Sequence, residues 1–401
     1  MTQPGELARR PARAQRRAVA RTPALAGTLT AWAAIAGGAA IAGCAASGPA
    51  PVPQQMAALA LLPLGQAGIT DGRGRYREIF CGVLAARGSA RRQARDCDEA
   101  LLRLAAEPAG TGAPVDLSRS TVGLDVFFVP GLASDCVGQA AAVEAELKQG
   151  LDRAGFRLRA VPVSGLSGSV ANASRIRDVV VSPGQSGPLR KAVVVGHSKG
   201  VVDTLEALAR FPELHGRIVA VVSLAGAVGG SPLADRAPAA LLELAASTPG
   251  LDCKESQRDA LADLSPAVRH LWLARNRLPA DVRFYSIVAL PMPDRVSSGL
   301  QVPYRLLGRI DRRNDGNLIF YDQVVPGSTL LAYANADHWA VMTDLASSAN
   351  PLVRGLADRN DFPRLAMLEA ALRFIEESLR PAADTTGLRC LPGSTLEGMP
   401  S

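Results

Sequence analysis

From about residue 115 the chain alternates between short apolar runs and segments in which apolar residues recur three and four positions apart. The runs are typical of buried strands and the spaced segments of amphipathic helices. The expected strands are residues 122–129, 156–163, 191–195, 217–226, 283–290 and 328–335, and the expected helices are 138–155, 170–181, 201–211 and 362–379. Strands that alternate with helices pair in parallel through right-handed crossovers. The sequence therefore predicts an α/β fold with a doubly wound, mostly parallel sheet covered on both faces.

Two helical segments fall outside this alternation. Residues 56–114 show mostly helical spacing, notably at 76–84 and 97–107, and predict a small helical N-terminal extension ahead of a main domain at 115–385. Residues 231–280 form an amphipathic helical insertion between two expected strands. We interpret this insertion as a cap whose apolar face lines a pocket, the alternative being an excursion that packs on the sheet. Residues 386–401 are expected to be a C-terminal tail.

The N-terminus has the layout of an export signal, with six arginines before an apolar run that ends at Cys44. The residues Ile41-Ala42-Gly43-Cys44 resemble the bacterial lipobox. This predicts a signal peptide at 1–43, a lipid-bearing Cys44 and a linker to residue 55. The run is also close to the length of a transmembrane anchor. Either interpretation places the rest of the chain in the cell envelope, attached to a membrane and facing the periplasm or the exterior.

Charge and composition exclude several classes of partner. Residues 1–43 hold six arginines and one glutamate, so their removal lowers the formal net charge from +7 to +2. The high pI is therefore mostly a targeting feature, and no nucleic-acid partner is expected. The chain lacks CxxC, HExxH and His-rich patterns, which argues against a metal site. No cofactor is expected either.

The cysteines predict a disulfide in the extension. An exported protein can form disulfides, and Cys81 and Cys97 lie close in sequence on either side of an arginine-rich stretch. They are the favoured pair. The partners of Cys136, Cys253 and Cys390 stay open, because connectivity cannot be deduced from sequence.

The stretch KAVVVGHSKG (191–200) contains the candidate nucleophile, Ser198. A GxSxG pattern alone is weak, but this one follows an expected strand and opens an expected helix, as a nucleophile elbow requires. Gly196 and Gly200 suit a strained, crowded turn that exposes the serine at the carboxyl end of a strand. Ligands bind at that edge of an open α/β sheet.

A serine needs a base, and the chain has only four histidines. His338 directly follows the last expected strand, whereas the other three suit structural roles. The imidazole in turn needs a carboxylate. Asp315 lies in an Asn-Asp-Gly turn after an expected strand at 304–310, and Asp311 stays as its competitor. Lys199 as the base is disfavoured, because the elbow directs its side chain away from Ser198.

These residues resemble those of the α/β-hydrolases, closest to the lipase and esterase branch. Ser198, Asp315 and His338 occur in that fold's order, and GHSKG resembles the lipase GHSxG elbow. LAGAVGGSPLAD (224–235) resembles the stretch that precedes the lid of bacterial lipases. The similarity covers about residues 120–380.

The resemblance implies a serine hydrolase that cleaves small-molecule carboxylic esters or lipids, with the amides of Leu132 and Lys199 as the oxyanion hole. The family's His-Gly is replaced by Pro130-Gly131, which puts the support of that loop in doubt; a disulfide of Cys136 is one substitute. Two alternatives stay open: an acyltransferase with the same triad, and a non-catalytic envelope lipoprotein that binds a ligand.

Overall fold

The computed structural model describes residues 64–65, 67–87, 95–104, 106–134, 140–182, 190–236, 259–348 and 350–380. The predicted signal peptide, the lipidation site Cys44, the linker and the C-terminal tail all lie outside these ranges. So do Cys136, Cys253 and Cys390. Within the described ranges, no helix is both long enough and apolar enough to cross a membrane.

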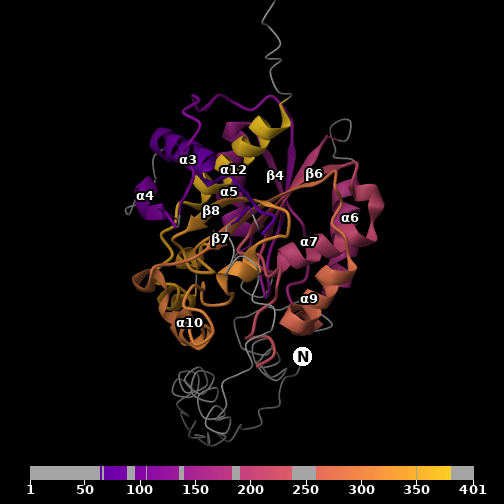
Figure 1. Cartoon of the computed structure of the whole chain (residues 1–401), viewed down its shortest axis with the longest axis vertical. Helices are drawn as coiled ribbons and strands as arrows, with labels where there is room; N and C mark the ends of the chain where they lie inside the picture. The colour runs from indigo at the N-terminus through magenta and orange to yellow at the C-terminus, as the bar shows by residue number, and fades with distance from the viewer. Residues whose placement is uncertain are drawn as a thin grey trace, which may run out of the picture. The chain divides into compact units, whose positions relative to one another are not determined.

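The core of the molecule is an eight-stranded sheet (Figure 1). Its strands are β1 (Thr70–Asp71), β2 (Leu101–Leu102), β3 (Asp125–Val129), β4 (Arg157–Ala160), β5 (Ala192–His197), β6 (Ile218–Leu224), β7 (Arg283–Ala289) and β8 (Thr329–Ala334). The spatial order is β1-β8-β7-β6-β5-β3-β4, and all neighbours on this path are parallel. β2 pairs with β8 in the antiparallel direction. The predicted doubly wound, mostly parallel sheet is confirmed.

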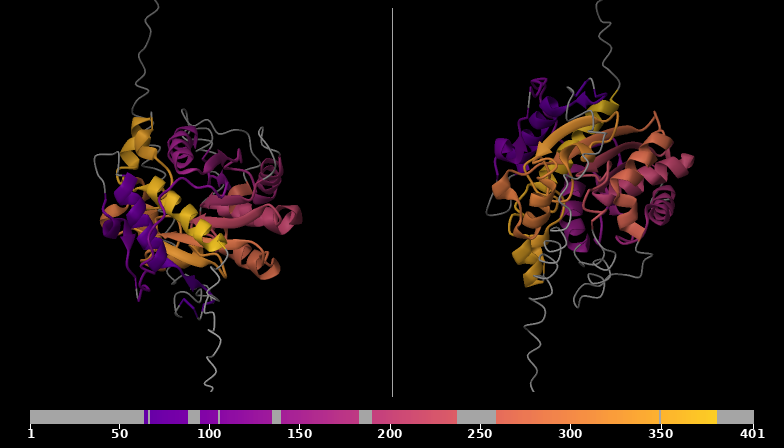
Figure 2. Two further views of the ribbon diagram at one scale, coloured as in Figure 1. Left: turned by 90° about the horizontal axis from the view of Figure 1, so that it is seen from above. Right: turned by 60° about the horizontal axis from the view of Figure 1, so that its bottom comes forward.

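Helices cover both faces of this sheet (Figures 1 and 2). One face packs against α3 (Arg73–Arg87), α5 (Ala140–Ala154) and α12 (Arg364–Leu379), and the other against α6 (Ser169–Val181), α7 (Lys199–Arg210) and α9 (Pro266–Arg275). Alternate strand residues divide between the two layers, as the two-residue period of a strand requires. In β3, for example, Phe128 belongs to the first core and Phe127 to the second.

The expected strand at 304–310 is wrong, because this segment belongs to helix α10 (Gln301–Leu307) and the turn after it. Pro303 gives the physical reason. A proline cannot donate a hydrogen bond to a sheet ladder, but it fits the first turn of a helix, where the N–H groups have no partner. The other six expected strands are present, with ends that shift by a few residues.

The N-terminal extension is less helical than predicted. The helix expected around residues 97–107 is only the four-residue α4 (Cys97–Ala100), and β2 follows it at once. Leu101 and Leu102 pair with Ala334 and Tyr333 of β8, so pairing at the sheet edge prevails over helical spacing. β1 also pairs with β8. The extension is thus part of the central sheet.

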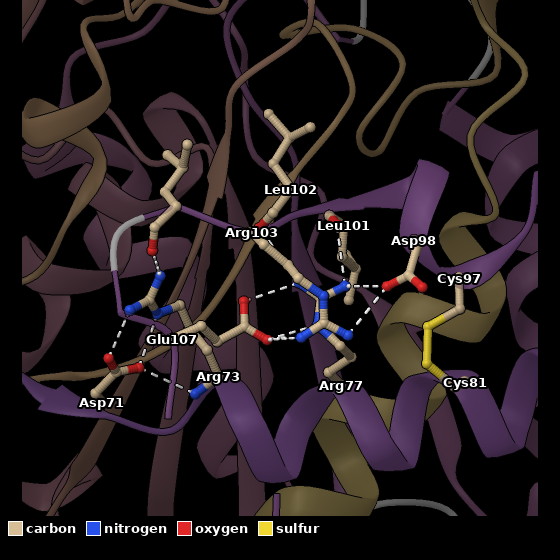
Figure 3. Close-up of polar contacts among 11 residues, drawn as sticks. Asp71, Arg73, Arg77, Cys81, Cys97, Asp98, Leu101, Leu102, Arg103 and Glu107 are labelled. Atoms are coloured by element: carbon tan, nitrogen blue, oxygen red, sulfur yellow. Dashed lines mark hydrogen bonds and ion pairs between the residues drawn. A yellow bond between two sulfur atoms is a disulfide. The ribbon is translucent and has the colours of Figure 1, made fainter. Parts of the chain in front are cut away.

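Cross-links hold this extension together (Figure 3). A disulfide joins Cys81 on α3 to Cys97 at the start of α4, with the two Cα atoms 5.3 Å apart. Arg77, one turn before Cys81, donates to the carbonyl of Leu101 over 3.0 Å and forms an ion pair with Glu107. The disulfide and the arginine therefore fix α4 and β2 to α3.

The sheet order identifies the edge at which a ligand site is expected. β4 and β5 lie on opposite sides of β3, so the chain reverses its direction of travel across the sheet there. In open α/β folds, ligands bind outside the carboxyl ends of the strands at such a switch point. The loops that leave β3 and β5 meet at this edge of the molecule.

Candidate active site

Ser198 occupies a strained turn between β5 and α7. Its backbone dihedrals are φ 55° and ψ −123°, in a region that residues with a side chain seldom adopt. Two bonds hold this conformation: the Ser198 N–H donates to Leu224 over 3.1 Å, and its carbonyl accepts from Ala227 over 3.1 Å. The turn is thus fixed by the neighbouring strand β6 and the loop after it.

The two glycines of the elbow are required by close backbone contacts. A Cβ atom on Gly196 would lie 2.8 Å from the Val201 nitrogen, and one on Gly200 would lie 2.1 Å from the Val129 carbonyl oxygen. Backbone atoms of a strand and a helix cannot move aside as a flexible side chain can. The pattern GHSKG therefore allows α7 to start close to β3 and β5.

Ser198, His338 and Asp315 form a continuous hydrogen-bonded chain. His338 Nε2 lies 2.8 Å from Ser198 Oγ, and His338 Nδ1 lies 2.7 Å from Asp315 Oδ2. The other oxygen of Asp315 accepts from the amides of Asn317 and Leu318, at 2.8 and 2.7 Å. The carboxylate is fully buried. Its orientation is therefore set by the backbone, and it can hold the imidazole in the tautomer with hydrogen on Nδ1.

The competing carboxylates are engaged elsewhere. Asp311 accepts from the Arg313 guanidinium at 2.7 and 3.0 Å. Asp337 accepts from the amides of Ser297, Trp339 and Ala340 over 2.8 to 3.0 Å. Neither contacts His338 through its carboxylate, so Asp315 is the acid that the structure brings to the histidine.

The backbone of His338 is held as firmly as its ring. Its N–H donates to the Asp315 carbonyl over 3.0 Å, and its own carbonyl oxygen lies 3.0 Å from Nε2 of His197. Burial and the neighbouring His338 lower the pKa of His197 to about 3, so its ring is neutral and donates this bond. The sequence suggested only a structural role for His197. Its contact with His338 depends on the order of the strands in the sheet, which the sequence alone does not give.

The loop after β3 packs directly against the serine. A Cβ atom on Gly131 would lie 2.8 Å from the Cβ of Ser198. Ala133, two residues later, has a φ of 55°, and the Ser134 N–H closes the turn on the Gly131 carbonyl over 3.4 Å. The loop thus places Leu132 in the same cavity lining as Ser198, without the His-Gly that many lipases carry. Cys136, the suggested brace, lies outside the described residues.

The Lys199 side chain points away from the serine hydroxyl. It is buried, and its Nζ lies 2.6 Å from Asp203 Oδ1, one helical turn on. Asn172 of α6 donates to the other oxygen of Asp203 over 2.8 Å. The ammonium group of Lys199 therefore forms a buried ion pair with Asp203. The Lys199 N–H lies in the first turn of α7, where an amide has no partner within the helix.

A largely apolar cavity of about 380 Å³ opens beside the triad. Ser198 and His338 border it, together with Leu132 of the loop after β3. Leu233, Leu261 and Leu264 from the predicted cap segment line it too, the last two from a 3₁₀ helix at Asp259–Leu264. Part of the insertion thus forms a wall of the pocket; residues 237–258 lie outside the described ranges.

Comparison with solved structures places this site in a family. The metagenomic carboxyl esterase MGS0156 is 41% identical, with a TM-score of 0.73 over 80% of this chain and 96% of that one. The chain belongs to this esterase family of the α/β-hydrolase fold. The chain also shows weaker similarity to the Bacillus licheniformis lipase BlEst2 (19% identity, TM-score 0.42, 61% of this chain and 91% of that one) and to EstA from Clostridium botulinum (16%, 0.45, 64% and 91%).

No protein-family model matches the chain, and no curated protein sequence does. Family membership therefore rests on the similarity to the solved carboxyl esterase. Among the described residues, no group of three or more His, Cys, Asp or Glu side chains is placed to hold a metal ion.

Proposed function

We propose that this hydrolase cleaves carboxylic esters by a serine mechanism. The observation that carries the proposal is the hydrogen-bonded chain from Ser198 through His338 to Asp315, at 2.8 and 2.7 Å. It lies at the mouth of an apolar cavity, in a fold shared with a carboxyl esterase. An aligned serine, imidazole and buried carboxylate is the arrangement that nucleophilic acyl transfer requires.

The reaction proceeds in two steps. Ser198 Oγ attacks the ester carbonyl while His338 Nε2 accepts its proton, and Asp315 stabilises the imidazolium that forms. The imidazolium then gives the proton to the departing alkoxide, which leaves as an alcohol. Water, deprotonated by the same nitrogen, attacks the acyl-enzyme and releases the carboxylic acid, and Ser198 regains its proton.

The backbone amides of Leu132 and Lys199 are the proposed oxyanion donors. Leu132 follows β3 and lines the cavity with Ser198, and Lys199 follows Ser198 directly at the start of α7. Donors of this kind act where negative charge develops in the transition state, and the loss of one costs about 10²- to 10³-fold in kcat. The turn at Gly131–Ser134 supplies the support that His-Gly supplies in many lipases.

The cavity favours small apolar esters. An engineered cavity of about 150 Å³ can hold one benzene molecule, so 380 Å³ accommodates an acyl group of short or medium length. Apolar walls hold the acyl chain through burial. We therefore expect higher kcat/KM for short and medium acyl esters than for long-chain ones.

Labelling with a fluorophosphonate tests the serine mechanism. Ser198 of the wild-type protein should displace fluoride from the probe, so that intact mass shows one adduct. The variants Ser198→Ala and His338→Ala should show none. Hydrolysis of a p-nitrophenyl ester should vanish in the same two variants. A folded wild-type protein that stays unlabelled would contradict the mechanism and favour a ligand-binding role. Product analysis with added alcohols would reveal acyl transfer.

We further propose that the chain is exported and anchored by lipid on Cys44. The support is the order of six arginines, an apolar run and the lipobox-like Ile41–Cys44. Expression in a bacterium followed by mass analysis of the mature N-terminus tests it. A diacylated cysteine at the N-terminus is the expected result, and a chain that begins upstream of Cys44 would contradict it.

A further inference from the structure

Asn335 connects strand β8 to the histidine loop. It follows the last residue of β8 and precedes His338 by three positions. Its side chain bonds at both ends: Nδ2 donates to the Glu99 carbonyl over 2.9 Å, and Oδ1 accepts from the Met292 N–H over 2.8 Å. The residue is buried. A buried amide with both ends bonded has a defined position and orientation.

The backbone of Asn335 is held by the N-terminal extension as well. Its N–H donates to the Ala100 carbonyl over 2.8 Å, and its carbonyl accepts from the Arg95 guanidinium. Three of its four partners, Arg95, Glu99 and Ala100, therefore come from one short stretch of the extension. Arg95 is itself buried and forms an ion pair with Asp361, which ties this stretch to the segment before α12.

The stretch that holds Asn335 is cross-linked to α3. The disulfide Cys81–Cys97 anchors the start of α4, and Arg77 bonds the carbonyl of Leu101 at its end (Figure 3). On the other side of α3, the Tyr76 hydroxyl donates to the Met367 carbonyl of α12 over 2.9 Å. A continuous set of bonds thus runs from the core helix α12 to Asn335.

The short link from Asn335 to His338 is held by local hydrogen bonds. Ala336 N–H bonds the Ala334 carbonyl over 2.8 Å, and the Asp337 carboxylate caps the turn that carries His338 and Trp339. A shift of Asn335 is therefore passed on to the imidazole rather than absorbed by the loop. Misplacement of a catalytic group by about 1 Å can cost 10²-fold in rate.

We propose that Asn335, held by residues 95–101 of the extension, is a positioning residue for His338, and that the Cys81–Cys97 disulfide supports this arrangement. This inference rests on the proposed serine mechanism. It gives the extension a role in the reaction, although none of the extension residues that bond Asn335 lines the cavity at the triad. The extension acts on the alignment of the imidazole with Ser198, and the substrate pocket is unaffected.

Kinetics of single variants of the full chain distinguish positioning from plain structural support. Asn335→Asp keeps the oxygen that accepts from Met292 but replaces the donor to Glu99 with a second oxygen. We expect kcat for a short p-nitrophenyl ester to fall by about 10²-fold, with KM within about twofold of wild type. Fluorophosphonate labelling should slow by a similar factor at a temperature well below melting.

Arg75→Ala is the matched control. Arg75 is also a mostly buried arginine of the extension, and it pairs with Glu377 of α12 at 2.7 and 2.9 Å. Its bonds do not reach Asn335. Arg75→Ala should lower the melting temperature and leave kcat and the labelling rate unchanged.

Two further variants keep the test decisive if Asn335→Asp does not fold. Arg95→Lys retains the charge but cannot bond Asp361 through two nitrogens and Asn335 at once, and the pair Cys81→Ser with Cys97→Ser removes the cross-link. Lower kcat at unchanged KM in either folded variant supports the proposal. Wild-type kcat in these variants, despite lower melting temperatures, would overturn it. Full labelling of Ser198→Ala would instead refute the serine mechanism itself.

Discussion

Each polar atom of His338 has a partner, and the partners come from two distant parts of the chain, residues 197–198 and residue 315. The ring bonds Ser198 and Asp315, the N–H bonds the Asp315 carbonyl, and the carbonyl contacts His197. This defines the position of the imidazole before any substrate binds. In the proposed mechanism, preorganisation of this kind spares the reaction the cost of ordering its catalytic groups.

Asp315→Asn tests the role of the carboxylate. The side-chain NH2 of Asn would donate to Nδ1 and stabilise the imidazole tautomer with its hydrogen on Nε2, which cannot accept the proton of Ser198, so kcat should fall by about four orders of magnitude. Asp311→Asn is the control, because Asp311 pairs with Arg313 at the surface and should change kcat by less than about twofold, within the small effect of a surface ion pair. Steady-state ester hydrolysis measures both, and a large loss at Asp311 alone would reverse the assignment.

Asp322 predicts a pH dependence of stability that is separate from catalysis. It lies in the 3₁₀ helix Phe320–Gln323, and burial raises its pKa to about 7. In the unfolded chain an aspartate titrates near pH 4. Between these two pH values the folded state holds a proton that the unfolded state lacks, so stability falls as the pH rises through this window.

Asp322→Asn should remove this contribution. From pH 4 to pH 8, the wild type should lose more free energy of unfolding than the variant does. The difference between the two losses should exceed about 1 kcal/mol, since one pKa unit corresponds to about 1.4 kcal/mol. Denaturant titrations at several pH values measure it. Asp294→Asn, at an exposed position, should follow the wild-type curve. Identical slopes for Asp322→Asn and wild type would contradict the prediction.

At the scale of elements, the site is assembled from loops at one sheet edge. The turn after β3 carries Leu132, the elbow after β5 carries Ser198, and the loop after β8 carries His338. Asp315 comes from the long segment between β7 and β8. Because these strands run parallel in one sheet, their carboxyl ends lie at the same edge, and the sheet fixes the loops relative to one another.

Gly131→Ala tests the close approach of the β3 loop to the elbow. The new Cβ would lie 2.8 Å from the Ser198 Cβ and 3.1 Å from the His197 carbonyl oxygen, so the loop or the serine must shift. We expect kcat to fall by about 10²-fold. Gly216→Ala is the control, since nothing lies within 4 Å of its Cβ position. Equal kcat in the two variants would show that the loop adapts without cost.

At the scale of the whole molecule, the extension is joined to the hydrolase sheet rather than appended to it. It contributes β1 and β2 at the β8 edge, and α3 packs against α12 in the same core. The edge of a parallel sheet would otherwise expose unpaired backbone groups. The extension thus covers that edge and meets the histidine loop.

The disulfide should contribute to global stability. Cross-links that close loops of about 15 residues stabilise proteins by about 3 kcal/mol in the chain-entropy account, and Cys81 and Cys97 are 16 residues apart. We therefore expect a reductant to lower the melting temperature of the wild type and to leave the Cys81→Ser, Cys97→Ser variant unchanged. A reductant effect that persists in the variant would assign the stabilisation to other cysteines.

Local patterns were enough to predict the layered fold and to single out Ser198 and His338 as candidates, with Asp315 and Asp311 left as alternatives. Strand and helix periods show in single segments, and GHSKG carries its own geometry because Gly196 and Gly200 face backbone atoms of adjacent elements. The segment 304–310 is helical where a strand was expected, because a short apolar run is compatible with either a strand or a helix and only its packing decides between them. The helix expected at 97–107 failed because Leu101 and Leu102 pair with β8, a contact more than 200 residues away along the chain.

The sequence by itself determined the layered sheet and singled out Ser198 and His338 as candidates, because strand and helix periods and the motif GHSKG depend on residues within a few positions of one another. Tertiary structure alone decided between Asp315 and Asp311, turned His197 toward His338, and joined Asn335 to the extension. Those choices depend on which distant segments meet in space. Hydrogen bonds act over about 3 Å, so they are settled only when the whole chain has packed.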